Sequence, residues 1–262
     1  MIRVIHTLGG CGGTLLCRCL GVLPGAAILT EINPGAVKLF EHFHPLYQDA
    51  HWLHLLDNHD HKRFLEMDLT EKDNFRQLIE VFHKRAQAKG KHLILRDFSY
   101  IDFVGAPYVS QAAGQLTIYK ALPPAIAKKA VAFIRHPMDQ YTSLSKHTEL
   151  LPEMTASVFL DAYSSFLDKI GNMSIYKYEA FVGDPDTQMR AVCKSLYLPF
   201  EPSFIERFHN FDSVTGDLTR LGETSISLPK KKTMTKPLIE EFRASAVYRR
   251  ILSATGYQDR VN

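Results

Sequence analysis

The chain has 262 residues, of which 45% are hydrophobic and 23% are charged, so its composition excludes an intrinsically disordered protein. This length is enough to bury roughly three quarters of the surface of the unfolded chain, and we expect one domain over residues 1–262. The formal net charge of +3 is too small to indicate nucleic acid as a partner.

The cysteines do not follow a pattern typical of disulfides or of zinc ligands. Cys11, Cys17 and Cys19 are crowded together and the fourth lies far away, so we expect reduced thiols and a cytoplasmic protein. Arg3 and His6 interrupt the apolar start of the chain, which argues against a secretion signal. Because no run of about 18 uncharged apolar residues occurs, we predict no membrane span.

Short apolar runs alternate with longer amphipathic segments along the chain, which is typical of a parallel sheet with crossover helices. The predicted strands are residues 3–8, 26–30, 92–97, 130–136 and 173–179. The predicted helices are residues 70–89, 137–149, 155–170 and one long helix that begins at Pro237. Several of the strands are apolar on both faces. We therefore expect a three-layer α/β/α fold with a central parallel sheet.

Four glycines follow the first predicted strand, in the stretch "HTLGGCGGTLLCRCL" over residues 6–20. A strand that ends in glycines and leads straight into a helix places bare backbone N–H groups at a helix N-terminus, which is a common phosphate site. Thr14 adds a hydroxyl group. No lysine precedes Thr14, so the GxxxxGK[ST] pattern of an ATP-dependent and Mg²⁺-dependent P-loop kinase is incomplete. The alternative to a phosphate site is a tight turn without a ligand.

A second informative stretch is "AVAFIRHPMDQYTSLSKH", residues 130–147. Arg135 stands at the carboxyl end of a predicted strand, and Ser143 follows about two helical turns later. Ligands of open α/β sheets gather at the carboxyl ends of strands, so we expect this site and the glycines to face one crevice. A guanidinium group with a nearby hydroxyl suits a second phosphate group.

Together these stretches resemble those of sulfotransferases that use 3'-phosphoadenosine-5'-phosphosulfate (PAPS). In that family the glycine loop binds the 5'-phosphosulfate, and an Arg and a Ser eight residues apart bind the 3'-phosphate. Arg135 and Ser143 keep this spacing. The stretches "YKYEAFVGDP" (176–185), "LYLPFEPSF" (196–204) and "VTGD" (214–217) are similar to later segments of the family.

The resemblance implies a P-loop nucleoside-triphosphate-hydrolase-like fold and PAPS as the donor, with adenosine 3',5'-bisphosphate as the product. It also implies transfer of a sulfuryl group to a hydroxyl or amine of a small-molecule, carbohydrate or lipid acceptor. The cofactor-binding residues that it implies are Gly10, Cys11, Gly12, Gly13, Thr14, Leu15, Arg135, Ser143 and a late basic group of Lys230, Lys231 and Lys232. The alternatives are a P-loop kinase and a nucleotide-binding protein without transfer activity.

Gly10 stands where the family usually has Lys or Arg, so another cation is expected to neutralise the leaving phosphate. We expect Arg96 to provide it, while an ion pair with Asp97 is its alternative. Glu31, which follows the second strand, is the first candidate for the base that accepts the acceptor proton. The alternative role of Glu31 is that of an N-cap or first-turn acid of the helix that starts near Pro34. Asp97 is the second candidate and His6 a weaker third.

Six of the twelve histidines fall in residues 41–64 and raise the question of zinc. Partners at fixed ligand spacing are missing, so we expect no metal site. We expect a helical insert over about 33–64 on the acceptor side, with Phe43, Trp52 and Leu53 forming an acceptor wall or simply core. A mobile basic loop is expected over about 211–236.

Overall fold

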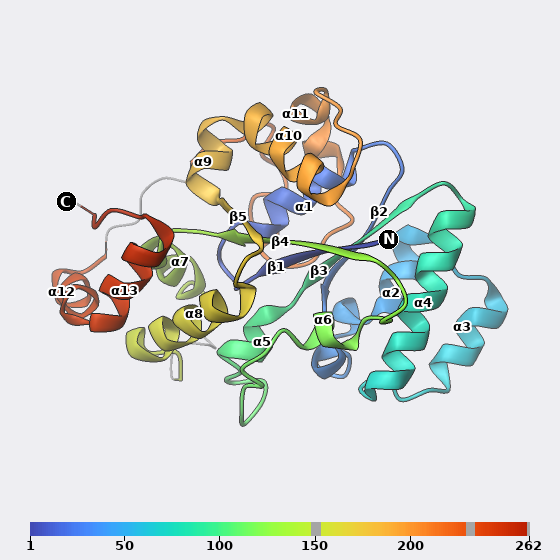
Figure 1. The fold of residues 1–262 in the computed structure, drawn as a ribbon, viewed down its shortest axis with the longest axis horizontal. Coiled ribbons are helices and arrows are strands. Elements are labelled where there is room, and N and C mark those ends of the chain that lie inside the picture. The colour runs from blue at the N-terminus through green and yellow to red at the C-terminus, as the bar shows by residue number, and fades with distance from the viewer. Residues whose placement is uncertain (148–152, 229–233, 261–262) are drawn as a thin grey trace.

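The computed structural model describes residues 1–147, 153–228 and 234–260. A sheet of five parallel strands lies at its centre, in the order β2-β3-β1-β4-β5 (Figure 1). The strands are β1 (Ile2–Thr7), β2 (Ala26–Ile32), β3 (His92–Asp97), β4 (Lys128–Ile134) and β5 (Ser174–Lys177). The prediction of an α/β fold around a parallel sheet is confirmed.

The strand order reverses between β1 and β4. From β1 the chain crosses over to β2 and returns through β3 on one side of the sheet, and it then continues to β4 and β5 on the other side. In open α/β sheets the crevice beyond the carboxyl ends of the strands at such a reversal is where ligands bind. The segments that follow β1 and β4, residues 8–13 and 135–147, therefore border the crevice.

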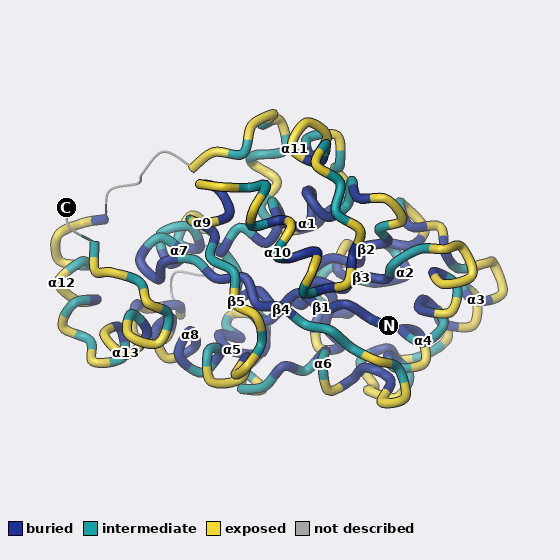
Figure 2. Tube along the Cα trace, turned by 45° about the horizontal axis from the view of Figure 1, so that its top comes forward, coloured by how far each residue is buried: buried dark blue, intermediate teal, exposed yellow. Residues whose placement is uncertain are grey.

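Side chains of the inner strands alternate between two buried faces, as expected from the geometry of a strand. On the first face Ile5, Ile94 and Phe133 pack with residues of α1 (Gly13–Gly21) and α10 (Pro185–Leu196). On the second face Val4 and Leu95 pack with residues of α4 (Lys72–Ala88). Figure 2 shows the strands at the centre as mostly buried, with exposed residues concentrated on the outer helices and loops. The core thus lies in two layers, one on each side of the sheet.

Shorter helices complete the two layers (Figure 1). The first face also carries α9 (Tyr178–Gly183) and α11 (Phe204–Arg207), and the second carries α5 (Ser99–Phe103), α6 (Thr117–Ala121) and α8 (Ala156–Ile170). Helix α7 (Pro137–Leu144) begins directly after β4, while α12 (Lys236–Ala244) and α13 (Ala246–Thr255) pack against α8. No helix in residues 1–147, 153–228 and 234–260 is long and apolar enough to cross a membrane.

Several predicted element boundaries differ from the structure, most of them by one or two residues. The strand predicted over 173–179 ends at Lys177, because Tyr178 begins α9. The helix predicted over 137–149 ends at Leu144. The single late helix is in fact two, because Ser245 is extended, with φ −69° and ψ 125°, and its side chain caps α13 by accepting a hydrogen bond from the Tyr248 amide.

Residues 33–64 form short turns and helices rather than one long helix. They comprise η1 (Pro34–Ala36), η2 (Glu41–Phe43), α2 (Pro45–Gln48), η3 (Asp49–Leu53) and most of α3 (Asn58–Leu65). Gln48 attaches this segment to the sheet, because its buried amide accepts a hydrogen bond from the Thr30 amide and donates one to the Thr30 carbonyl. The segment is therefore held beside the carboxyl end of β2.

Candidate active site

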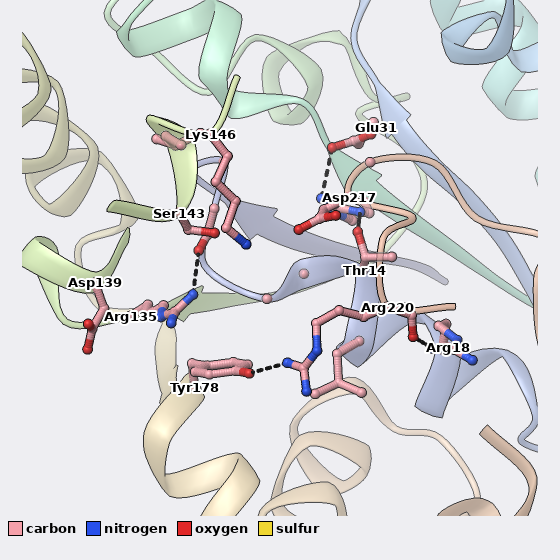
Figure 3. Close-up of a pocket in the computed structure, with 18 of the residues that line it drawn as sticks. Thr14, Arg18, Glu31, Arg135, Asp139, Ser143, Lys146, Tyr178, Asp217 and Arg220 are labelled. Carbon is pink, nitrogen blue, oxygen red and sulfur yellow. Dashed lines mark hydrogen bonds and ion pairs between the residues drawn. The ribbon is translucent and has the colours of Figure 1, made fainter. Parts of the chain in front are cut away.

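A cavity of about 570 Å³ opens at the carboxyl ends of the strands, where the strand order reverses (Figure 3). This volume is typical of small-molecule sites. The predicted site residues that line it are Gly10, Gly12, Gly13, Thr14, Leu15, Glu31, Arg96, Arg135 and Ser143. Of the other predicted site residues, Cys11 and Asp97 do not line it, and Lys230, Lys231 and Lys232 lie outside the described residues.

The glycine loop, residues 9–13, leads from β1 into the N-terminus of α1. Gly12 is the N-cap residue with φ +90°, and a Cβ atom there would lie 2.3 Å from the Tyr178 ring. Only glycine fits both constraints. Because Gly12 has no side chain and the first turn of α1 has no acidic residue, the first amide groups of the helix receive no protein cap. This end of α1 therefore favours an anion.

Cys11 belongs to the loop but faces the core. Its side chain is 1% exposed, and burial raises the pKa of the thiol to about 11. A neutral buried thiol contributes packing rather than chemistry. Any contact of Cys11 with a ligand would come from its backbone.

Arg135 lies at the opposite side of the loop from Glu31 (Figure 3). Its Nη1 atom donates to the Gly10 carbonyl at 3.3 Å, and its guanidinium lies over the Tyr178 ring at 4.7 Å. Its Nε atom is buried and has no hydrogen-bond partner among the described residues. Ser143 lines the same part of the cavity from α7. The cation–π contact orients the guanidinium while leaving part of its hydrogen-bonding capacity for a ligand.

Arg96 and Glu31 form a buried ion pair beneath the start of α1. Arg96 Nη2 lies 2.9 Å from Glu31 Oε1, and the two side chains are 5% and 8% exposed. Nη1 of Arg96 donates to Thr14 Oγ1 at 3.2 Å and to the Thr215 carbonyl at 3.3 Å. Burial alone would lower the pKa of Arg96, but the charge of Glu31 and neighbouring groups outweighs it, so the pKa is raised. The guanidinium is thus a fixed positive charge next to the glycine loop.

A bulge in β2 turns the Glu31 side chain toward Arg96. Between Leu29 and Ile32 the β2 strand has one more residue than the matching stretch of β3, and Glu31 itself has φ +51°. An extra residue of this kind re-aims a side chain, and a left-handed non-glycine residue is a strained conformation typical of functional sites. Asn33, rather than Glu31, caps the following turn at Pro34. The alternative of Glu31 as a helix-start acid is therefore excluded.

The second carboxylate oxygen of Glu31 is the unusual atom of the site. Oε2 is buried and has no hydrogen-bond partner among the described residues. A Cβ atom on Gly216, whose φ is +99°, would lie 3.2 Å from it, so the 214–217 turn closes over the carboxylate. A buried carboxylate oxygen without a donor is costly. It is therefore a position where the hydroxyl of a ligand would be stabilised.

Asp97 faces the other side of the sheet from Arg96, because successive residues of a strand point to opposite faces. Its carboxylate is fully buried, lies 2.8 Å from His6 Nδ1 and accepts a hydrogen bond from Ser99 Oγ at 2.8 Å. The structure therefore does not support Asp97 or His6 as a base in the cavity. The expected alternative pairing of Arg96 with Asp97 is also wrong, because the partner of Arg96 is Glu31.

A buried arginine on α1 holds the wall that faces the loop. Arg18 is 3% exposed and donates to the backbone carbonyls of His209, Phe211, Arg220 and Leu221. Thr215 is fixed as well, since its amide and hydroxyl bond to Thr30 Oγ1. Residues 209–221 are thus tied to α1 and β2 although they contain almost no regular structure.

Five aromatic side chains form a continuous wall of the cavity. Their ring centroids lie 4.8 to 6.3 Å apart in successive pairs. They are Phe40, Phe43, Phe98, Tyr100 and Tyr108, which all line the cavity. A Cβ atom on Gly9 would lie 3.4 Å from the Tyr100 ring, and the Phe98 amide donates to the Ile32 carbonyl. The wall therefore borders both the glycine loop and the residue after Glu31.

Comparison with known proteins identifies the fold of the chain. No protein-family model and no curated protein sequence matches the chain. The solved "Sulfotransferase Domain from the Synechococcus PCC 7002 Olefin Synthase" matches with a TM-score of 0.67 and 19% identity, covering 98% of this chain and 94% of that chain. The "Sulfotransferase Domain from the Curacin Biosynthetic Pathway" matches with a TM-score of 0.62 and 14% identity, covering 98% of both chains. The chain has the sulfotransferase fold.

Within this sulfotransferase fold, the loop cannot carry a cation at position 10. Gly10 has φ +76°, and a Cβ atom there would lie 2.9 Å from Leu144 Cγ and 3.0 Å from the Gln140 carbonyl oxygen. A lysine or arginine would therefore be both strained and crowded. The positive charges around the loop come instead from neighbouring elements.

Several lining residues of this sulfotransferase fold were not predicted from the sequence. Lys146, three residues after Ser143, extends into the cavity between Ser143 and Thr14 (Figure 3). Its place just after the helix that carries Ser143 could have indicated it. Asp217 faces it, and although burial raises the pKa of Asp217, bonds from Thr219 and the charges of Lys146 and His147 lower it overall.

Two further lining arginines had no sequence signal. Arg220 donates to the Tyr178 hydroxyl at 3.1 Å and pairs with Glu223, and Arg260 pairs with Asp139. Both come from segments outside the recognised motifs.

The histidine-rich segment has partners other than a metal. No group of three potential metal ligands occurs in the part of the chain that the structure describes. His51 stacks on Tyr47 and His61 pairs with Asp49. Of the three residues expected as acceptor wall or core, Phe43 lines the cavity, whereas Trp52 and Leu53 pack in the core beside α4.

Proposed function

We propose that the protein is a PAPS-dependent sulfotransferase that acts on an apolar hydroxyl compound. The observation that carries the proposal is the place of the Glu31–Arg96 pair, between an anion site and an aromatic wall. The glycine loop lies next to Arg96 at Gly13, and the aromatic wall lies next to the residue after Glu31 at Phe98 and next to the loop at Gly9. A two-substrate transfer needs this order of donor site, charged centre and acceptor site.

The donor would bind along the glycine loop. The free amides at the start of α1 suit the phosphosulfate, and Arg135 with Ser143 suits the 3'-phosphate. Arg96 lies beneath the loop, since a Cβ atom on Gly13 would lie 2.8 Å from its Nε atom. It is the residue that we assign to the charge developing on the leaving phosphate, in place of the cation missing at Gly10.

Glu31 is the residue that we assign as the base. In the transfer, the acceptor oxygen bonds to sulfur as the bond between sulfur and the phosphate oxygen of the donor breaks, and the acceptor proton passes to Glu31 Oε2. That oxygen is unpaired among the described residues, while Oε1 is held by Arg96. Arg96 therefore orients the carboxylate as well as carrying charge.

The aromatic wall narrows the acceptor class. All five rings face one cavity, and His42, which also lines it, packs against Phe40 and Phe43. Burying an aromatic or aliphatic acceptor against these rings is favourable, whereas an anionic carbohydrate would lose its hydration there without compensation. We therefore favour an uncharged phenol or comparable apolar alcohol over a polyanionic sugar.

The first test is calorimetric titration with adenosine 3',5'-bisphosphate and, separately, with ATP and Mg²⁺. Micromolar binding of the bisphosphate alone supports the donor site. Binding of ATP with Mg²⁺ alone would return the glycine loop to the kinase alternative. If the bisphosphate binds but PAPS with 2-naphthol and with a panel of alcohols, sugars and amines gives no product, the protein is a binding protein without transfer activity.

A further inference from the structure

A strap made of residues 257–260 ends at Arg260, which lines the cavity, and its first half is fixed to Glu179 and to His136, the residue after Arg135. The Tyr257 hydroxyl donates to Glu179 Oε2 at 2.8 Å, while Glu179 Oε1 accepts the His136 amide at 2.9 Å. Nε2 of His136 donates to the Gln258 carbonyl at 3.2 Å. One carboxylate thus joins the strap to the residue that follows Arg135.

The second half of the strap is fixed equally firmly. The Asp259 carboxylate pairs with Arg243 at 2.9 Å and accepts a hydrogen bond from the Tyr248 hydroxyl at 2.9 Å. Arg243 also donates to the Arg260 carbonyl. The Arg260 side chain pairs with Asp139 in the first turn of α7. Every residue of the strap therefore has a defined side-chain or backbone partner, and Arg260 is held in place from both ends.

Arg260 lies in the cavity beside Arg135. Both side chains line it, together with Asp139. Burial lowers the pKa of Arg260, and the like charge of Arg135 lowers it further. Two guanidinium groups that repel each other are normally kept apart by solvent. Here the fold holds them at one site, beside the carboxylates of Asp139 and Glu179, and the buried Nε of Arg135 has no hydrogen-bond partner among the described residues.

We propose that Arg260 is a second arginine of the 3'-phosphate site, acting with Arg135 and held by Asp139 in the free protein. The proposal rests on the proposed donor, PAPS. A phosphate carrying nearly two negative charges is matched better by two guanidinium groups than by one. Because the loop carries no cation at Gly10, a larger share of the charge of the donor falls to residues outside it.

The test compares adenosine 3',5'-bisphosphate with adenosine 5'-monophosphate, which lacks the 3'-phosphate. For Arg260→Ala we expect bisphosphate affinity to fall at least about tenfold, as for loss of a charge-assisted hydrogen bond, and monophosphate affinity to stay the same. Arg260→Lys should recover part of the loss. Arg249→Ala is the matched control, because this arginine lies on α13, does not line the cavity and donates to the carbonyls of Arg243 and Ala244.

A double variant separates direct binding from an indirect effect. Arg260→Ala alone leaves Asp139 without its partner, and that freed carboxylate would itself repel a phosphate. In Arg260→Ala with Asp139→Asn both charges are absent. If Arg260 contacts the phosphate, the double variant stays at least about tenfold weaker than the wild type. Recovery of wild-type bisphosphate affinity in the double variant would overturn the proposal.

The outcomes also distinguish this proposal from the proposed function. A wild type that binds no bisphosphate contradicts both. A wild type that binds it, with Arg260→Ala binding equally well, contradicts the Arg260 site alone. Melting temperatures measured without nucleotide show whether each variant is folded. If Arg260→Ala lowers the affinities for both nucleotides equally, the strap supports the fold and the proposal fails.

Discussion

The donor side and the acceptor side of the cavity are built in different ways. The donor side is made of backbone and charge: glycines with positive φ, a helix N-terminus and arginines held by neighbouring side chains. The acceptor side is made of five packed rings from three separate segments. A single charged donor can be bound by a rigid arrangement of groups, whereas apolar packing adapts to acceptors of different shape. The contrast indicates that changes on one side should leave binding on the other side nearly intact.

The largest expected effect lies between the two sides. Glu31→Gln keeps a hydrogen-bond acceptor for Arg96 but removes the base, so we expect turnover of PAPS and 2-naphthol to fall by about 10²- to 10⁴-fold. Affinity for adenosine 3',5'-bisphosphate should change by less than about threefold. This ligand is the donor product and does not supply the acceptor proton that Glu31 takes up. Steady-state kinetics and calorimetry measure the two quantities. Normal turnover in this variant would show that Glu31 is not the base.

On the donor side, Arg135→Ala should weaken bisphosphate binding by about 10- to 100-fold, because a charge-assisted contact is lost. The affinity of 2-naphthol, measured by equilibrium dialysis without nucleotide, should be unchanged. Arg190→Ala is a suitable control, since this exposed arginine also lies over an aromatic ring, Phe200, but does not line the cavity. Equal loss for nucleotides with and without a 3'-phosphate would argue against the assignment.

The donor side should also contribute to the dependence of stability on pH. Burial, aided by the charge of Arg260, lowers the pKa of His136 to about 4 from its ordinary value near 6.5. The unfolded chain therefore takes up this proton first, and the contribution of His136 to stability, present above pH 6.5, is lost as the pH falls to about 4. We expect it to be about 3 kcal/mol. Urea unfolding at pH 7 and pH 4 should show a smaller loss in His136→Gln, and an equal loss in both proteins would contradict this.

The smallest effect is expected at the aromatic wall. Tyr108→Ala removes one half-buried ring of five and should raise the KM for 2-naphthol by about 5- to 10-fold, as for loss of an aromatic contact. The KM for PAPS should not change. Tyr47→Ala serves as the control, because it removes a ring that is also half-buried but stacks on His51 outside the cavity. If Tyr108→Ala raises the KM for PAPS instead, the division into two sides is wrong.

The sequence predicted the parts of the site that depend on local order. The glycine loop follows a strand and opens a helix, and the interval from Arg135 to Ser143 is fixed by one strand end and one helix. The parallel sheet could be predicted for the same reason, because each strand is an apolar run of its own. These features need no knowledge of distant contacts.

The rest depends on contacts between distant segments. Glu31 reaches Arg96 only because β2 gains an extra residue against β3, and no residue type in "ILTEINP" marks that bulge. Asp97 was a candidate base because the direction of its side chain depends on strand register, which the sequence leaves open. The aromatic wall and Arg260 join segments that lie far apart in the chain, so neither had a pattern to find.

Arg18 has a consequence for the expected mobile loop of about 211–236, of which the structure describes residues 211–228 and 234–236. One guanidinium bonds to four carbonyls of residues 209–221, so this irregular stretch cannot open a few residues at a time without breaking a buried charge-assisted contact. Its amides, including that of Thr215, should then exchange with solvent as one cooperative unit, as slowly as those of α1 itself. Loss of the single Arg18 side chain would remove four contacts of the stretch at once and leave it attached at Thr215 by the bonds to Thr30.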